Sequence, residues 1–162
     1  MTSLYKFFFV LVSLGFLLPN SHATEIPPSK VIGEFHKSLL EVMKNAKSLS
    51  TKDRYRELEP AIDRAFGFGF MIKLASGTSW SKINNQYKDD LKQAFRRMSI
   101  ATYAYRFKGY SGQRFVTTGT TPGVRGTRLV LTNIVSPQEN KRDEIIKLTY
   151  VTKKFGSSWK VI

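Results

Sequence analysis

Hydrophobic residues recur at steps of three or four positions through the middle of the chain. The longest such series comprises Ile83, Tyr87, Leu91, Ala94, Met98, Ala101 and Tyr105. This period places all seven on one face of a helix. We expect Thr78 or Ser79 to cap this helix and Lys108-Gly109 to end it. Such an apolar stripe needs an apolar partner, and the pattern alone leaves open whether that partner is the protein core or a bound ligand.

Two shorter helical segments precede this stripe. The first should begin at Ser29, after two prolines, and run to about Leu49. Its apolar side fits either a helix that covers the core or one that lies on a membrane surface; the residues are Ile32, Phe35, Leu39, Val42, Met43 and Ala46. Ser50 and Asp53 form a capping box for the second helix, which Pro60 should break or restart.

Aromatic residues and glycines alternate between the second helix and the stripe. Gly67 and Gly69 separate Phe66, Phe68, Phe70 and Met71. We expect a hinge between short helices here that turns these side chains in different directions. A phosphate-binding loop is not expected, because no strand precedes the glycines and a third glycine is missing.

From Tyr110 onward the hydrophobic period changes from helical to alternating. Four strands are predicted, over residues 113–119, 124–135, 144–152 and 159–162, separated by turn-forming or polar segments. Helices followed by an antiparallel meander predict an α+β fold, in which N-terminal helices pack on one face of a twisted, mainly antiparallel four-stranded sheet. Neither an internal repeat nor a linker interrupts the pattern, so a single domain is expected.

The first 23 residues have the layout of a secretory signal peptide. Lys6 precedes an uncharged apolar run over residues 7–18, and Ser21-His22-Ala23 forms a small-residue cleavage site. The run is too short for a membrane-spanning helix. We therefore expect cleavage after Ala23 and a periplasmic domain over residues 24–162. The chain has no Cys, so this domain must be stable by packing without disulfides.

Positive charge is spread along the whole chain. Lys and Arg number 26 against 12 Asp and Glu, which gives a formal net charge of +14. Such a surface favours polyanionic partners. For an exported protein these are anionic lipid headgroups or an acidic protein surface, and a general contribution to solubility is the alternative explanation.

Residues that could carry catalysis are sparse. His36 is the only histidine after the predicted cleavage site, so neither a metal cluster nor a proton relay is indicated. The carboxylate pairs Glu57/Glu59 and Asp89/Asp90 point to different sides of their helices. We expect no enzyme activity, metal or cofactor. A small enzyme would need two distant carboxylates, or His36, to converge in a pocket.

Nucleic acid is not an expected partner either. Residues 108–115 partly match an RNA-recognition submotif, but Gly112 stands where an aromatic residue is needed, and a helix precedes in place of strands. Aromatic and apolar side chains are instead concentrated between residues 66 and 110. They could line a cavity for an apolar ligand or fill a solid core, and composition does not separate the two.

The order of several short motifs resembles a known family. These are Glu59-Pro60-Ala61-Ile62, Phe66 with Phe70-Met71, Gly77 with Trp80, Phe95 with Ala101-Thr102-Tyr103-Ala104, residues 107–115, and the closing residues 156–162. Together they resemble the toluene-tolerance, or Mla-pathway, family of periplasmic lipid-binding proteins, most of all its hopanoid-associated branch. Two departures are Gly67, where the family usually has an acidic residue, and the end at Ile162, where the family continues into a terminal helix. We therefore expect residues 24–162 to be a domain truncated at its C-terminus.

The resemblance implies a carrier for phospholipid or a hopanoid-like lipid. Such carriers hold acyl chains in an apolar cavity between helices and sheet. They shuttle lipid between an outer-membrane protein complex and an inner-membrane ABC transporter complex, with transient contact to membrane surfaces. The residues implied to bind lipid are Phe66, Phe70, Met71, Leu74, Phe95, Met98 and Tyr105. The rival hypothesis is a periplasmic adaptor protein with a filled core and no ligand.

Overall fold

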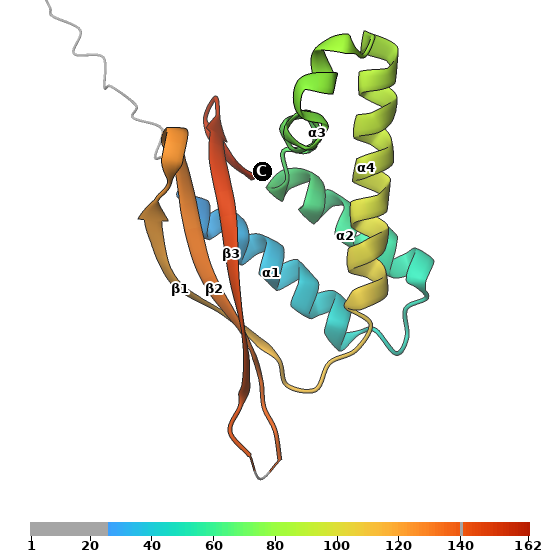
Figure 1. Ribbon diagram of the computed structural model, residues 1–162. Helices are drawn as coiled ribbons and strands as arrows, with labels where there is room; N and C mark the ends of the chain where they lie inside the picture. Colours follow the sequence, from blue (N-terminus) through green and yellow to red (C-terminus); the bar gives the residue numbers. More distant parts are fainter. Residues whose placement is uncertain (1–25, 140) are drawn as a thin grey trace, which may run out of the picture.

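The computed structural model describes residues 26–139 and 141–162; the predicted signal peptide and its cleavage site at Ala23 lie outside these residues. Helices come first and strands follow (Figure 1). In chain order the elements are α1 (Pro28–Lys44), α2 (Thr51–Ala65), α3 (Phe68–Ser76), the 3-10 helix η1 (Gly77–Lys82), α4 (Asn85–Arg106), β1 (Arg114–Pro122), the 3-10 turn η2 (Val124–Gly126), β2 (Thr127–Ser136), β3 (Glu144–Phe155) and β4 (Ser158–Val161).

The four strands form an antiparallel meander in the order β1-β2-β3-β4. Val130 of β2 pairs with Tyr150 of β3, and Thr152 of β3 pairs with Val161 of β4. Residues paired in this way lie on the same side of the sheet. All four of these side chains are buried or half-buried, so this is the side that faces the core. The α+β fold predicted from the sequence is confirmed.

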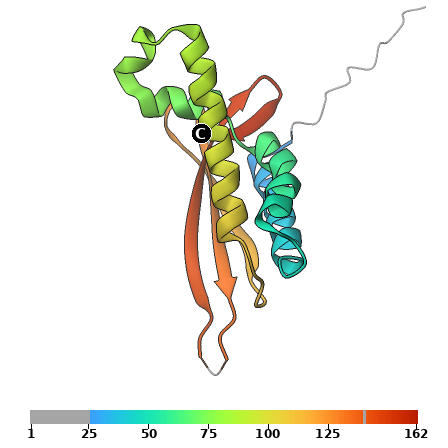
Figure 2. The same ribbon diagram turned by 90° about the vertical axis from the view of Figure 1, so that its right-hand side faces the viewer.

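Helix α1 covers the sheet, and α2 packs against α1 and β4 (Figure 2). Ile32, Phe35 and Leu39 of α1 are at most 1% exposed. They meet Leu58, Ala61 and Ile62 of α2 in one hydrophobic cluster that also includes Val130 and Val161 of the sheet. The apolar side of α1 is therefore occupied by the core, which decides against a membrane-surface role for this helix.

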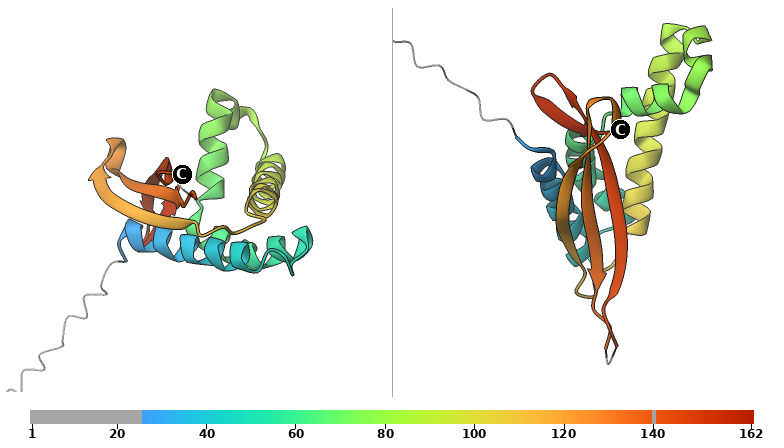
Figure 3. Two further views of the ribbon diagram at one scale, coloured as in Figure 1. Left: turned by 90° about the horizontal axis from the view of Figure 1, so that it is seen from below. Right: turned by 60° about the vertical axis from the view of Figure 1, so that its left-hand side comes forward.

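Helix α4 packs on α2 and α3, and it stands apart from the strands when the molecule is seen from below (Figure 3). Ile100 and Ala104 face α2 and are buried. Arg96 donates hydrogen bonds to Glu59 and Asp63 of α2 at 2.5–2.6 Å, and these bonds raise the pKa of Arg96 further. The contact between α4 and α2 therefore combines a short apolar stripe with an ion-pair network.

Arg54 joins three segments where α1 ends, α2 begins and α4 ends. Its buried guanidinium donates to the carbonyl oxygen of Ala104 at 2.9 Å, to that of Leu49 at 2.5 Å and to Thr51 Oγ1 at 3.0 Å. These acceptors lie at the end of α4, in the loop after α1 and in the first turn of α2. A single buried side chain therefore satisfies carbonyl groups that would otherwise lack partners.

The end of the chain returns to the junction between α2 and α3. Phe66 and Val161 form an isolated parallel bridge, and the Gly67 amide donates to the Val161 carbonyl at 2.8 Å. A Cβ atom on residue 67 would lie 3.3 Å from both the Lys160 Cβ and the Val161 oxygen. Glycine at this position therefore permits the close approach of β4.

The structure corrects several local predictions. Pro60 does not break α2, which is continuous from Thr51 to Ala65; Leu58 and Ile62, packed in the core on either side of the exposed proline, hold the helix across it. The cap of α4 is Asn84, whose Oδ1 accepts from the Tyr87 amide at 2.9 Å, whereas Thr78 and Ser79 lie in the separate helix η1. The first helix was expected to run to about Leu49, but α1 ends at Lys44. The second strand was expected to begin at residue 124, but residues 124–126 form a turn before β2.

Candidate functional site

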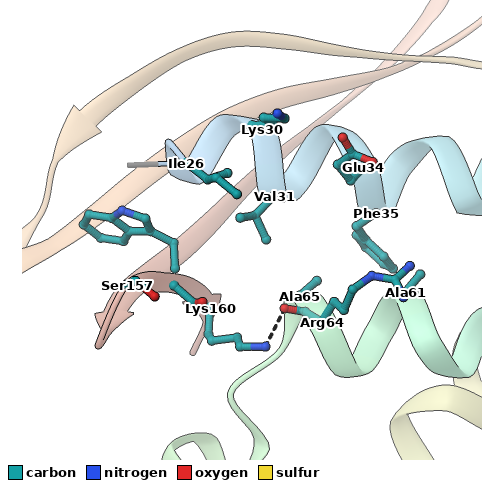
Figure 4. Close-up of a pocket in the computed structure, with 12 residues that line it drawn as sticks. Ile26, Lys30, Val31, Glu34, Phe35, Ala61, Arg64, Ala65, Ser157 and Lys160 are labelled. Carbon is teal, nitrogen blue, oxygen red and sulfur yellow. Dashed lines mark hydrogen bonds between the residues drawn. The ribbon is translucent and has the colours of Figure 1, made fainter. Parts of the chain in front are cut away.

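A pocket of about 400 Å³ lies between the start of α1, the end of α2 and the β3–β4 hairpin (Figure 4). Its inner surface is apolar. Val31 and Phe35 project from α1 toward Ala61 and Ala65 of α2 (Figure 4). Trp159 of β4 also lines the pocket. Pockets of roughly 300–1,000 Å³ with apolar linings and a few polar groups are typical small-molecule sites.

The helices and the hairpin place these side chains for simple reasons. Val31 and Phe35 are four positions apart and so share one face of α1, and Ala61 and Ala65 have the same relation in α2. The two alanines leave space where larger residues would fill the gap between the helices. Ile26 also lines the pocket and is 50% exposed, so the pocket is in contact with solvent there.

Cations dominate the polar part of the pocket. Lys30, Arg64 and Lys160 contribute to its lining against one carboxylate, Glu34. Lys30 and Glu34 point to the side of α1 away from α2, whereas Lys160 reaches toward the end of α2 (Figure 4). The Lys160 ammonium donates to the carbonyl oxygens of Asp63 at 3.1 Å and Arg64 at 2.6 Å, and partial burial lowers its pKa.

These hydrogen bonds leave room for a ligand at Lys160. An ammonium group has three N–H donors, and two are used by the carbonyl groups at the end of α2. A positive charge here also complements the negative end of the helix dipole. The arrangement can therefore hold an apolar chain against Val31 and Ala65 and an anionic group at Lys160.

Behind Phe35 lies an aromatic cluster that connects the helices with the sheet. The Phe35 ring packs edge-on against Phe66 and Tyr103, with ring centroids 5.3 Å and 5.2 Å apart. His36 stacks on Phe115 at 4.2 Å and shares a hydrogen bond of 3.0 Å with the Tyr150 hydroxyl. Edge-to-face and offset aromatic contacts of this kind stabilise the packing beyond the area they bury.

Burial shifts the pKa values of the polar members of this cluster. It lowers the pKa of His36 to about 4, so the imidazole is neutral at neutral pH. It raises the pKa of Tyr103 to about 12 and also raises that of Tyr150, so both phenols keep their protons. The cluster is therefore uncharged at neutral pH, and His36 is a buried packing residue.

The seven residues predicted to bind lipid are separated in the structure. Phe66 is buried against Phe35, and Phe95 is half-buried in edge-to-face contact with Phe68. Phe70 and Met71 are half-buried on α3, where Phe70 contacts Phe155. Leu74, Met98 and Tyr105 are 57%, 58% and 64% exposed. None of the seven lines the pocket of Figure 4, and their role in lipid binding stays a prediction.

Sequence reasoning missed the residues that do line this pocket. Val31 and Phe35 lie on the apolar side of α1. The apolar pattern of this helix does not show that its N-terminal end lines a pocket. The signal available was the small size of Ala61 and Ala65 at helical spacing opposite large residues. Pairing that signal with β4 requires the bridge between Phe66 and Val161, which is a contact between residues distant in the sequence.

The part of the chain that the structure describes offers no cluster of three metal-ligating side chains. None of its helices is long and apolar enough to cross a bilayer.

Comparison with known proteins extends these observations. A search of curated proteins found no match. The fold is similar to that of a phospholipid-binding protein from Ralstonia solanacearum, solved in complex with a phospholipid, with a TM-score of 0.69 and 16% sequence identity over 84% of this chain and 75% of that one. Residues 34–162 match the family described as MlaC protein. The chain therefore belongs to the MlaC family, as the order of its motifs predicts.

Proposed function

We propose that this protein is a periplasmic lipid carrier that takes the apolar part of a lipid into the pocket between α1, α2 and the β3–β4 hairpin. The observation that carries the proposal is this apolar, cation-bordered pocket in a member of the MlaC family. The phospholipid held by the Ralstonia solanacearum relative supports the same class of ligand.

The energetics of such a carrier are simple. Each methylene group moved from water into an apolar pocket gains roughly 0.8 kcal/mol. A lipid leaving a membrane alone would lose this for every methylene it exposes, and the pocket restores part of it. The pocket volume of about 400 Å³ lies near the lower end of the range for small ligands, so we expect it to hold part of one acyl chain.

The positive charge of the pocket lining favours an anionic ligand. The third N–H donor of Lys160 would meet a phosphate group once the chain lies between Val31 and Ala65, and Arg64 adds positive charge to the lining. Phospholipids satisfy both requirements. A hopanoid-like lipid without a phosphate would use the apolar surface alone.

Of the seven residues predicted from the sequence, Phe66 has the most direct relation to this pocket. Its ring packs on Phe35, which forms part of the wall, so it fixes the depth of the pocket from behind. The other six would contribute only if the ligand extended beyond the pocket along α3 and α4.

A passive pocket has no energy source, so the direction of transport must come from partners. We propose that the protein exchanges lipid with an outer-membrane protein complex and an inner-membrane ABC transporter complex. The predicted signal peptide would place it in the compartment between them.

Native mass spectrometry of protein purified from bacteria tests the proposal. We expect co-purifying phospholipid with the unaltered protein and strongly reduced occupancy in Val31→Trp, which fills the pocket. Val124→Trp is the matched control, because Val124 is 79% exposed and lies outside the pocket. Protein that carries no lipid in any form would favour the adaptor hypothesis.

A further inference from the structure

The helices α3, η1 and α4 form an arm; α3, η1 and the start of α4 extend beyond the body of the molecule, and the second half of α4 lies beside α2 (Figures 1 and 3). The apolar stripe of α4 and Leu74 of α3 are uncovered in the described part of the chain. Leu74, Tyr87, Met98 and Tyr105 are 57–64% exposed, and Leu91 is 38% exposed. Six of the seven stripe residues lie on α4, and their face is turned away from α2, because Ile100 and Ala104 make the contact with that helix.

Basic residues border this apolar face on both sides. Between residues 68 and 108 there are eight Lys or Arg and two Asp. Arg96 is held by Glu59 and Asp63 toward α2. The 3.6-residue period of α4 places Arg97 along one edge of the stripe and Lys88 and Arg106 along the other.

Two of these cations lie over aromatic rings, those of the exposed Tyr105 and the half-buried Trp80. The Lys108 ammonium is 4.9 Å from the centroid of Tyr105, and the Lys88 ammonium is 5.6 Å from the ring of Trp80. Long basic side chains that lie along aromatic and apolar residues while their charge stays in water are suited to a membrane–water interface.

We propose that this arm docks the protein on the surface of an anionic lipid bilayer. An amphipathic helix with aromatic and aliphatic residues on one face and Lys or Arg beside them binds in the interfacial plane, and its affinity depends on anionic lipid. Each basic residue held near such a surface strengthens binding roughly fivefold. The arm would lie along the membrane with its apolar stripe against the acyl boundary.

The charges also argue against the alternative of a second copy on this face. Two chains of formal charge +14 would place the basic borders of both stripes against each other, and like charges across an interface oppose association. An anionic bilayer surface attracts the same basic residues, so electrostatics favour docking there.

The apolar stripe of α4 is a surface separate from the pocket. The pocket is formed by α1, α2 and the β3–β4 hairpin, so docking can fail while lipid binding stands, and the reverse also holds. If both are correct, the arm brings a lipid-binding protein to the surface where its ligand is found.

Co-sedimentation with vesicles tests whether the arm docks the protein on an anionic bilayer. We expect the protein to bind vesicles that mix phosphatidylglycerol with phosphatidylcholine and to bind phosphatidylcholine vesicles more than about tenfold more weakly. Added salt should weaken the binding. The triple variant Tyr87→Ser, Met98→Ser, Tyr105→Ser should lose at least about tenfold in binding to the anionic vesicles.

The matched control removes three exposed apolar residues away from the arm. Val116, Val124 and Ile145 are 40%, 79% and 54% exposed, and changing all three to Ser should leave binding unchanged. Equal losses in both triple variants, or equal binding to neutral and anionic vesicles, would overturn the inference. So would a dimer seen by sedimentation velocity without lipid that the arm variant abolishes, because that result assigns the face to a second copy.

Discussion

The buried imidazole of His36 makes stability depend on pH in a defined window. His36 is 4% exposed, and burial lowers its pKa from 6.5 to about 4. The unfolded chain therefore binds a proton at His36 below about pH 6.5, whereas the folded protein stays neutral there down to about pH 4. The contribution of neutral His36 to the free energy of unfolding is therefore complete above about pH 6.5. It is lost progressively as the pH falls toward 4.

The size of the effect follows from the same shift. Each pKa unit corresponds to about 1.4 kcal/mol, so the full loss is about 3 kcal/mol and the loss between pH 7 and pH 5 is about 2 kcal/mol. Other shifted groups titrate elsewhere. The pKa of Asp53 is lowered to about 2, chiefly by its hydrogen bond with Ser50, and that of Tyr103 is raised to about 12.

Urea unfolding of the protein and of His36→Gln at pH 7 and pH 5 measures this contribution. Gln cannot titrate and retains groups that can hydrogen-bond the Tyr150 hydroxyl, so the variant should lose about 2 kcal/mol less stability than the unaltered protein between the two pH values. His36 is the only histidine after the predicted cleavage site, so a proton NMR titration gives its pKa directly. A midpoint near 6.5, or equal pH dependence in both proteins, would refute the reasoning.

Further predictions concern single positions in the fold. Arg54→Met should lower the free energy of unfolding by about 3 kcal/mol because it leaves the carbonyl groups of Ala104 and Leu49 without their donor, and Arg54→Lys should recover only part of this; equal stability of all three in urea would contradict it. Gly67→Val should destabilise the protein by about 1–3 kcal/mol through crowding against β4. Gly33→Ala, which meets no atom within 4 Å on α1, should stabilise it by up to about 1 kcal/mol, and thermal unfolding of the pair compares the two.

The regular pattern of the chain was sufficient to predict the elements of the fold. The helical period, the capping box of Ser50 and Asp53 and the alternation after Tyr110 all correspond to observed elements. Pro60 is an exception: proline disfavours a continuous helix, but the packing of Leu58 and Ile62 in the core overrides this local propensity.

The direction of the stripe on α4 could not be predicted from its period. Periodicity shows that residues share a face but not which neighbour covers it. The contact between α4 and α2 uses Ile100, Ala104 and Arg96 instead, and the more continuous apolar face is exposed. The pocket was hidden for a related reason, because it depends on where β4 returns relative to Ala61 and Ala65.

We propose above that the acyl part of a lipid lies between α1, α2 and β4. The most direct test is photocrosslinking of the purified protein with a phospholipid that carries a photoreactive group near the end of one acyl chain, followed by peptide mapping. We predict that the label is found on peptides containing Val31 and Phe35, Ala61 and Ala65, or Trp159, and that Val31→Trp reduces it. Labelling confined to the exposed stripe of α4, or labelling unchanged in Val31→Trp, would contradict the claim.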